Sequence, residues 1–293
     1  MSITKPHFTV SSIKRKALAF LSVSALLLIT SFVPANTVQG AVPNPPNGFR
    51  PILSALGVKV YQKDYPGGAP DYVTIVDLRQ GTLRSFTGNV TSDGSIYPRT
   101  LNTFWKDAVA QDSYNRKARV AINGTFFSEN SQQFMARPDP IAFGLKSDWW
   151  RMSYGYAIGK EYPGLIRTLA FDSISGNSSI QPYSRSTFDG GFPNVIGGLD
   201  PTANKDGQKN NNIPRTFVGL RDDDNDGRSE TVIFYSSAKA TQAYAASILN
   251  SFGAGSKMML DGGGSTGLIV NGEVKISSSR QIPQAFIICG GRQ

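Results

Sequence analysis

The sequence contains almost no histidine and almost no cysteine. The single histidine is His7 and the single cysteine is Cys289. His7 lies in an N-terminal segment that we expect to be removed, which leaves a chain without any imidazole. Ser-His-Asp and Cys-His catalysis and histidine-ligated zinc sites are then excluded. Acid–base chemistry must fall to carboxylates, lysine, tyrosine or bound water.

The lack of cysteine also excludes an internal disulfide. The chain therefore does not look like a small secreted domain held together by disulfides, and its fold must depend on its core. Cys289 ends the apolar run Ala285–Cys289. We interpret it as a small buried hydrophobic residue.

Residues 1–40 have the layout of a secretory signal peptide. Three basic residues, Lys14–Lys16, precede the apolar run Ala17–Val33, and small residues follow it. Cleavage is expected after Ala35 or Gly40. The apolar run is short for a membrane span. We predict an exported protein (periplasmic, cell-surface or extracellular) with no stable membrane span after cleavage; the alternative is an uncleaved anchor.

Charge gives little indication of a nucleic-acid partner. The formal net charge is +9, but residues 1–40 carry four basic and no acidic side chains, so the remaining balance is 26 to 21, or +5. The chain has no long lysine or arginine run, so we predict no nucleic-acid binding.

The rest of the chain divides into a linker and one domain. Residues 41–57 begin with a proline-rich stretch and are predicted to be a linker, and residues 58–293 to be a single domain. Short strands dominate. The best helix spans Ala240–Phe252, with Ser237 as its N-cap and Gly253 just after its end. We predict an α+β fold of mixed β-sheets with few flanking helices.

The stretch Met258–Gly272 carries the most information about function. An apolar run ends in Asp261, and three glycines and a hydroxyl follow. Glycines let a ligand approach the backbone closely, and successive exposed N–H groups in such a turn form a concavity for an anion. Asp261 would face a substrate from the end of the strand. The alternative is a glycine-rich turn without a ligand, because isolated glycine motifs match by chance.

Three motifs in order resemble the phosphodiester glycosidase family. They are Ala121-Ile-Asn-Gly-Thr-Phe-Phe127, Pro214-Arg-Thr-Phe-Val-Gly219 and Leu260-Asp-Gly-Gly-Gly-Ser265. The resemblance covers residues 70–290. The family contains the enzyme that removes N-acetylglucosamine from mannose-6-phosphate tags and many bacterial exported proteins. Thr125 departs from the family pattern, which more often has glycine there.

The resemblance implies hydrolysis of a glycosyl phosphodiester, and we expect the substrate in a surface polysaccharide or wall polymer. Such a site needs donors for phosphate and carboxylates near the anomeric carbon. Asp261 and Glu129 are the predicted catalytic carboxylates, with Asp189 as an alternative to Glu129. Phe126 and Phe127 are expected in the core, with sugar-stacking platforms as the alternative. The polar segment Asn204–Asn212 is expected to be a mobile loop over the site. The predicted substrate-binding residues are Asn123, Gly124, Arg215, Thr216, Gly262, Gly263, Gly264 and Ser265.

A second motif suggests a metal. Asp222, Asp224 and Asp226, followed by Gly227, match the first half of a calcium loop. Ile233 stands where the bidentate glutamate of such a loop is expected, and Glu230 is a possible further ligand. We predict a structural Ca²⁺ here and no cofactor required for catalysis; the alternative is a solvated acidic hairpin tip.

Two other classes of function remain open. A non-catalytic glycan-binding module on the same scaffold would keep the glycine cradle without needing a reactive Asp261, because a fold does not guarantee activity. The Leu260–Thr266 segment also resembles a phosphate loop of actin-like ATPases. Those folds need a second phosphate loop and an adenosine pocket, and the sequence shows neither.

Overall fold

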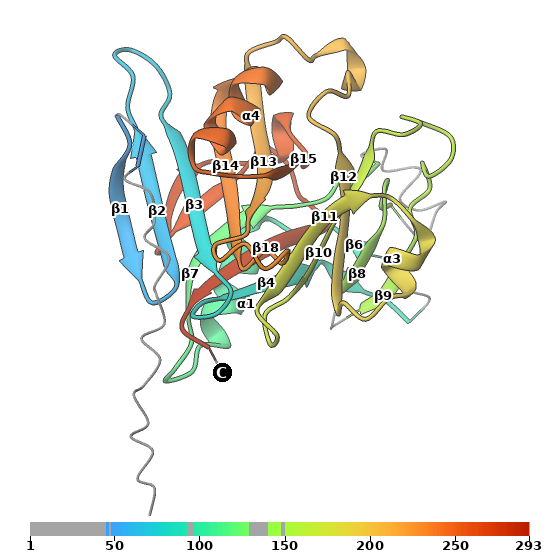
Figure 1. The fold of residues 1–293 in the computed structure, drawn as a ribbon, viewed down its shortest axis with the longest axis horizontal. Coiled ribbons are helices and arrows are strands. Elements are labelled where there is room, and N and C mark those ends of the chain that lie inside the picture. Colours follow the sequence, from blue (N-terminus) through green and yellow to red (C-terminus); the bar gives the residue numbers. More distant parts are fainter. Residues whose placement is uncertain (1–44, 47, 93–95, 129–139, 148–149, 293) are drawn as a thin grey trace, which may run out of the picture. The chain divides into compact units, whose positions relative to one another are not determined.

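The computed structural model describes residues 45–46, 48–92, 96–128, 140–147 and 150–292 (Figure 1). The predicted signal peptide lies outside this range. Residues from Gly40 onward form one compact unit. Within the described residues, no helix has the length and apolar character needed to cross a membrane.

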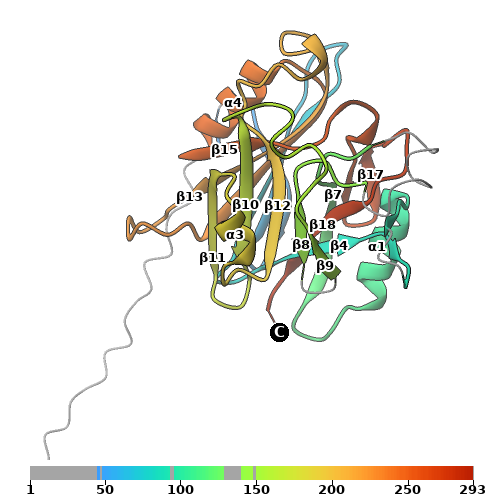
Figure 2. The same cartoon turned by 90° about the vertical axis from the view of Figure 1, so that its right-hand side faces the viewer.

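Most strands belong to one large sheet. Strands β8 (Leu145–Ser147) and β9 (Trp150–Ser153) extend it sideways from β12 (Figure 2). The main path of this sheet, in spatial order, is β1 (Arg50–Ala55), β2 (Val58–Lys63), β3 (Asp71–Asp77), β14 (Thr231–Ala240), β13 (Ile213–Arg221), β15 (Ser256–Met259), β12 (Asn194–Leu199), β10 (Ile166–Asp172) and β11 (Asn177–Pro182).

A smaller sheet and three helices complete the described part. β5 (Asn89–Val90) and β6 (Ile96–Tyr97) pair with each other alone. The helices are α1 (Leu101–Ala110), α3 (Arg185–Asp189) and α4 (Gln242–Ser251). The smaller sheet has the order β17 (Glu273–Ile276), β16 (Leu268–Val270), β7 (Lys117–Asn123), β18 (Gln284–Gly290) and β4 (Thr82–Thr87).

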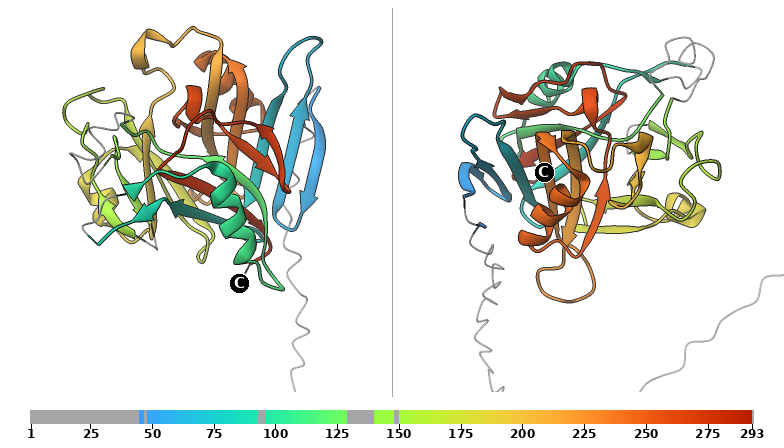
Figure 3. Two further views of the ribbon diagram at one scale, coloured as in Figure 1. Left: turned by 180° about the vertical axis from the view of Figure 1, so that it is seen from behind. Right: turned by 90° about the horizontal axis from the view of Figure 1, so that it is seen from above.

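The elements stack in layers, with α1 on the outer face of the smaller sheet and α4 on the outer face of the larger one, where α3 also packs through Phe188. Alternate residues of a strand point to opposite sides, so Phe234 of β14 lies between the two sheets while Tyr235 packs on the face covered by α4. In β18, Phe286 likewise points between the sheets, whereas Cys289 packs on the face covered by α1 (Figure 3, left). The prediction that Cys289 is buried is confirmed, and burial raises the pKa of its thiol to about 11.

The α+β class with few helices is confirmed, and three details differ from the predictions. Every described strand pair is antiparallel, whereas mixed sheets were expected. Parallel pairs need long crossover connections, whereas hairpins such as β13–β14 pair consecutive strands and make them antiparallel. Residues Arg50–Ala55, predicted as linker, form β1 and pair with β2.

The third difference is the start of the predicted helix. Strand β14 continues to Ala240, so Ser237 is a strand residue, and Thr241 is the N-cap, whose side chain accepts from the N–H of Tyr244. Gly253 follows the helix as expected, with φ of +85°. A left-handed residue at this position is typical of a helix end, and glycine adopts it without steric cost.

We predict that Phe286 is the side chain on which the contact between the sheets depends most. It is fully buried, and its ring centroid lies 5.0 Å from Phe234 and 6.2 Å from Phe171, both on the larger sheet. Phe286→Ala should lower the free energy of unfolding by about 3–5 kcal/mol, measured by urea denaturation. Val274→Ala is the control, because Val274 is an exposed residue of the same smaller sheet. A loss below about 1 kcal/mol for Phe286→Ala would contradict this role.

Candidate active site

The glycine-rich turn leaves β15 at the place where the two sheets meet. The N–H of Leu260 donates to the carbonyl of Thr216 on β13 (2.9 Å), and the N–H of Asp261 donates to the carbonyl of Gly124, just after β7 (3.0 Å). The 3-10 turn Gly263–Ser265 (η2) follows. The backbone N–H groups of Leu260 and Asp261 thus hold this point of the chain to both sheets.

The carboxylate of Asp261 is almost fully surrounded by donors. Asp261 as a whole is only 6% exposed. Oδ1 accepts from the N–H of Gly262 (3.0 Å), and Oδ2 accepts from the hydroxyl of Ser265 (2.5 Å) and from Nη2 of Arg280 (3.0 Å). Nε of Arg280 also donates to Oγ of Ser265 (2.6 Å). Arg280 therefore orients Oδ2 both directly, through Nη2, and through Ser265, which it also contacts.

Burial raises the pKa of Asp261 to about 7. The hydrogen bonds from Ser265 and Gly262 and the positive charge of Lys205 act in the opposite direction. The guanidinium of Arg280 also favours the ionised form, since an opposite charge at 3.0 Å stabilises a carboxylate. A carboxyl group with a pKa near neutrality is suited to acid–base or nucleophilic work.

Asn123 and Thr216 lie behind Asp261. Asn123 has no exposed surface; its Nδ2 donates to the carbonyl of Asp261 (2.7 Å), and its Oδ1 accepts from the hydroxyl of Thr216 (2.6 Å) and the N–H of Gly267 (3.2 Å). Both side chains thus use their polar atoms inside the protein. The predicted direct contact of either with a substrate would require these bonds to be exchanged.

Gly124 makes room for Gln284. A Cβ at Gly124 would lie 1.5 Å from Oε1 of Gln284, which accepts from the N–H of Thr125 (3.0 Å). The side chain of Gln284 is itself buried and donates to Oγ of Ser85 (3.1 Å). Gly124 therefore has two roles. Its lack of a side chain leaves room for Gln284, and its carbonyl accepts a hydrogen bond from the N–H of Asp261.

A cavity of about 240 Å³ opens beside Asp261, and we call it the Asp261 cavity. Lys205, Asp206 and Gln208 belong to the loop Asn204–Asn212, which therefore lies at the site as expected. Phe126 is buried, as predicted for a core residue, yet it also lines the cavity together with Phe127. The lining residues are Phe126, Phe127, Lys205, Asp206, Gln208, Ile213, Arg215, Met259, Leu260, Asp261, Gly262, Gly263, Gly264 and Arg280.

Cations outnumber carboxylates in this lining. Lys205 pairs with Asp206 (2.8 Å) and Arg280 pairs with Asp261 (3.0 Å). Arg215 is 5% exposed and donates to three backbone carbonyls, those of Gln208 (2.5 Å), Asn211 (3.3 Å) and Ala240 (3.3 Å). Among the described residues, no carboxylate forms an ion pair with Arg215.

The anion cradle predicted at Gly262–Ser265 is smaller than expected. The N–H groups of Ser265 and Thr266 donate to carbonyls within the turn, at 3.2 Å and 3.1 Å, and that of Gly262 donates to Asp261. In the part of the chain that the structure describes, the amides of Gly263 and Gly264 have no acceptor. Gly263 has φ of +55°, and the space beside its Cα is open.

Of the other predicted carboxylates, one lies outside the described residues and one lies away from the cavity. One cation of the site was not predicted. Glu129 lies outside the described residues. Asp189 accepts from the hydroxyl of Tyr154 (2.7 Å) and does not line the Asp261 cavity. Arg280 was not predicted, because it follows a serine run 19 residues after Asp261 and no local pattern connects the two.

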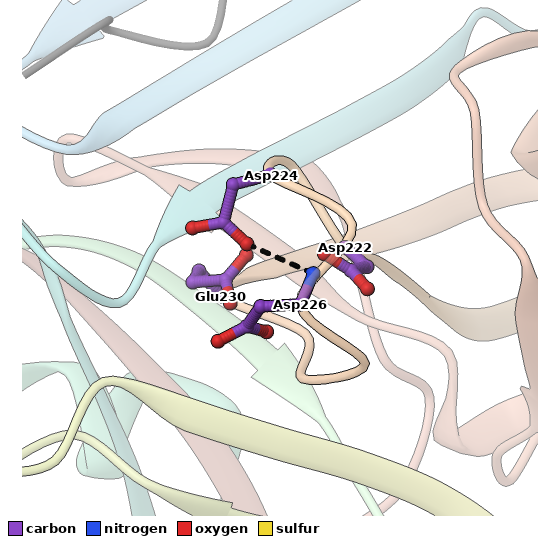
Figure 4. A group of neighbouring side chains, drawn as sticks. All are labelled: Asp222, Asp224, Asp226 and Glu230. Atoms are coloured by element: carbon purple, nitrogen blue, oxygen red, sulfur yellow. Dashed lines mark hydrogen bonds between the residues drawn. The ribbon is translucent and has the colours of Figure 1, made fainter.

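The predicted calcium loop brings its carboxylates together (Figure 4). One oxygen from each of Asp222, Asp224, Asp226 and Glu230 lies within 4.8 Å of the others. Glu230 is buried, whereas Asp224 and Asp226 are exposed. The loop is also shaped from within: Asp222 accepts from the N–H groups of Asn225 (2.7 Å) and Gly227 (2.8 Å). The residues present fit the oxygen ligands that Ca²⁺ prefers.

Comparisons with known proteins identify a family and a shared fold. The model of the phosphodiester glycosidase family matches residues 116–289. A search of curated proteins found no match. The structure is similar to the catalytic domain of zebrafish N-acetylglucosamine-1-phosphodiester alpha-N-acetylglucosaminidase auto-inhibited by its pro-peptide, with a TM-score of 0.55 and 15% identity over 83% of this chain and 85% of that one.

A second solved structure has the same fold. It is a hypothetical protein from Synechocystis, with a TM-score of 0.52 and 16% identity, over 85% of this chain and 64% of that one. The match thus spans less than two thirds of the Synechocystis protein. At these identities, the two structural likenesses show the fold alone.

The calcium prediction has a direct test in thermal unfolding. A ligand that binds only the folded state at 100 times its Kd adds about 2.7 kcal/mol to the free energy of unfolding, so millimolar CaCl₂ should raise Tm, and EDTA should reverse the rise. Asp224→Asn should weaken the effect by removing one ligand charge. Asp64→Asn, at an exposed ion pair with Arg50, is the control. An unchanged Tm at millimolar Ca²⁺ would exclude a calcium site here.

Proposed function

The chain belongs to the phosphodiester glycosidase family, whose model matches residues 116–289, and we propose that it hydrolyses the bond between the anomeric carbon of a sugar and a phosphodiester oxygen. Membership of this family supports the hydrolysis of a phosphodiester-linked sugar as the reaction. We further propose that the enzyme is exported through residues 1–40 and acts on a surface polysaccharide or wall polymer, because those residues have the pattern of a signal peptide.

The observation that carries this proposal is the unbalanced positive charge of Arg215. A buried guanidinium without a carboxylate partner has a large desolvation cost. A phosphodiester anion in the Asp261 cavity would supply the missing charge and accept charge-assisted hydrogen bonds. The N–H groups of Gly263 and Gly264, on the same wall of the cavity, would add neutral donors.

In the proposed reaction, Asp261 acts in its ionised form at the anomeric carbon. It serves there as the nucleophile or as the base that activates water. Arg280 and Ser265 hold its Oδ2, so Oδ1 is the oxygen with fewer fixed partners. The bond from carbon to oxygen breaks and the phosphate leaves as a phosphomonoester. Asp206 is a second carboxylate of the cavity, and Glu129 remains a predicted one.

The reaction is tested with residues 40–293, which form the compact unit. We expect release of free sugar from glycosyl phosphodiesters, with uridine diphosphate N-acetylglucosamine among the donors tried. Asp261→Asn should lower kcat/KM by roughly 10²–10⁴, the usual contribution of a positioned acid or base. Arg215→Lys keeps the charge but loses the guanidinium geometry, and should lower kcat/KM about 10-fold to 100-fold.

The control for these variants is Arg50→Lys. Arg50 forms an exposed ion pair with Asp64 and does not line the Asp261 cavity, so its replacement should leave sugar release unchanged. A folded protein that releases sugar from no donor, yet binds the same donors, would favour the alternative of a non-catalytic glycan-binding module.

The pH dependence should report on Asp261. Its pKa is raised to about 7, so the carboxyl group is mostly protonated below pH 7 and ionised above it. If the ionised form reacts, kcat/KM rises as the pH increases through about 7 and then levels off. Ser265→Ala removes a hydrogen bond that favours the carboxylate, and should shift this rise to higher pH. A rate that falls through pH 7 would instead make Asp261 a general acid.

A further inference from the structure

A second cavity adjoins the Asp261 cavity. Its volume is about 580 Å³, and we call it the Lys275 cavity. The two cavities share four lining residues, Gln208, Ile213, Gly263 and Gly264. The glycine turn therefore forms a low ridge between them, with no side chain of its own. A Cβ at Gly263 would meet no atom within 4 Å, so the space over the ridge is open there, whereas a Cβ at Gly264 would lie 2.7 Å from Oγ of Ser279.

The ridge has the properties of a phosphate site. The amides of Gly263 and Gly264 have no acceptor among the described residues, and Arg215 and Arg280 lie on the Asp261 side of the ridge. A glycosyl phosphodiester whose anomeric carbon lies near Asp261 would place its phosphate over these amides. The group on the far side of the phosphate, the aglycone, would then continue into the Lys275 cavity.

The lining of the Lys275 cavity limits what this aglycone can be. No described residue of the lining is aromatic or acidic, so the cavity offers no face on which a nucleobase would stack. Four neutral polar side chains and one cation, Lys275, line it. The complete lining is Gln208, Ile213, Pro214, Ala238, Gly263, Gly264, Thr266, Lys275, Ile276, Ser277 and Ser279.

Two of these residues point to a ligand. Thr266 is 1% exposed, and its Oγ1 is buried without a hydrogen-bond partner in the described structure. A buried polar atom without a partner is rare in a native protein and is often explained by a missing ligand or water. Lys275 is paired with Glu273 (2.6 Å), whose side chain is 71% exposed. The Lys275 side chain is 18% exposed, so the pair is open to solvent mainly on the Glu273 side, and an anion in the cavity would compete with Glu273 for the ammonium group.

We propose that the Lys275 cavity binds the aglycone of the substrate, and that this aglycone is a hydroxylated group with a second negative charge, not a nucleoside. A polyol phosphate unit has this chemistry. The inference rests on the proposed function, because it places the scissile phosphodiester over Gly263 and Gly264. Hydroxyl groups of the aglycone bond to Ser277, Ser279 and Thr266, and its charge pairs with Lys275.

The products follow from the balance of the reaction. Water adds its oxygen to the anomeric carbon, the bond from that carbon to the bridging oxygen breaks, and the phosphate keeps the bridging oxygen. The released aglycone is therefore a phosphomonoester. Its phosphate remains over the ridge and its polyol in the Lys275 cavity, so a small polyol phosphate should bind on its own.

The test is the binding of glycerol 3-phosphate to residues 40–293, measured by calorimetry, with uridine 5′-monophosphate as the comparison. We expect glycerol 3-phosphate to bind more tightly. Binding that is absent, or that is equal to or weaker than that of the nucleotide, would overturn the proposal. Oligo(glycerol phosphate) and vesicles of phosphatidylglycerol then distinguish a polymer from a lipid headgroup as the natural source of this chemistry.

Three variants assign the binding to the Lys275 cavity. Lys275→Gln should weaken the binding of oligo(glycerol phosphate), which carries the second negative charge, about 10-fold, which corresponds to roughly 1.4 kcal/mol. Thr266→Val preserves the side-chain shape and removes a hydroxyl that has no partner in the protein. It should therefore weaken binding without lowering Tm. Lys117→Gln is the control, because Lys117 is an exposed residue at the opposite end of β7 from Asn123.

The interpretation of these binding measurements does not depend on whether the protein is catalytically active. Unchanged affinity in both Lys275→Gln and Thr266→Val would overturn the assignment of the cavity, even if the enzyme cleaves its substrates. Loss of affinity in both, without loss of Tm, would support the cavity even if no sugar is released. Sugar release from a methyl glycosyl phosphodiester, which has no aglycone to place in the cavity, reports on the proposed function alone.

Discussion

The geometry of the site depends on one buried amide. Asn123 ends a strand of the smaller sheet, and its side chain bonds to Thr216 of the larger sheet, to the carbonyl of Asp261 and to the N–H of Gly267. One side chain thus connects both sheets to both ends of the glycine-rich turn. Because all of its partners are buried, loss of any one leaves a polar group without water or protein to satisfy it. The turn is consequently held as part of the core and not as a surface loop.

Much of the fold was predictable because local patterns determine it. Short apolar runs between turn residues indicated a chain rich in strands, and the helical pattern over Ala240–Phe252 located α4. The predictions failed where a boundary is set by partners distant in sequence. β14 runs three residues beyond a plausible helix cap at Ser237, because the antiparallel pairing with β13 continues to Ala240. β1 similarly owes its form to pairing with β2.

The site was predictable in part, for a related reason. The motif around Asp261 and the neighbouring Arg215 carry their own signal, since glycines and charged residues at a strand end are visible locally. The roles of Asn123 and of Arg280 are not, because each depends on side chains that are brought together from other strands. The same limit applied to Thr266: no sequence pattern distinguishes a threonine whose hydroxyl is left without a partner from one that is satisfied.

Arg215 holds the loop Asn204–Asn212 through backbone carbonyls alone, those of Gln208 and Asn211. Every amino acid supplies a carbonyl, so this anchorage makes no demand on the identity of the loop's side chains. Lys205, Asp206 and Gln208 can therefore be exchanged during evolution or in the laboratory while the loop keeps its path over the cavity. An arginine that anchors the loop in this way would leave substrate preference free to diverge between relatives, and a library confined to this loop would sample new specificities on an unchanged frame.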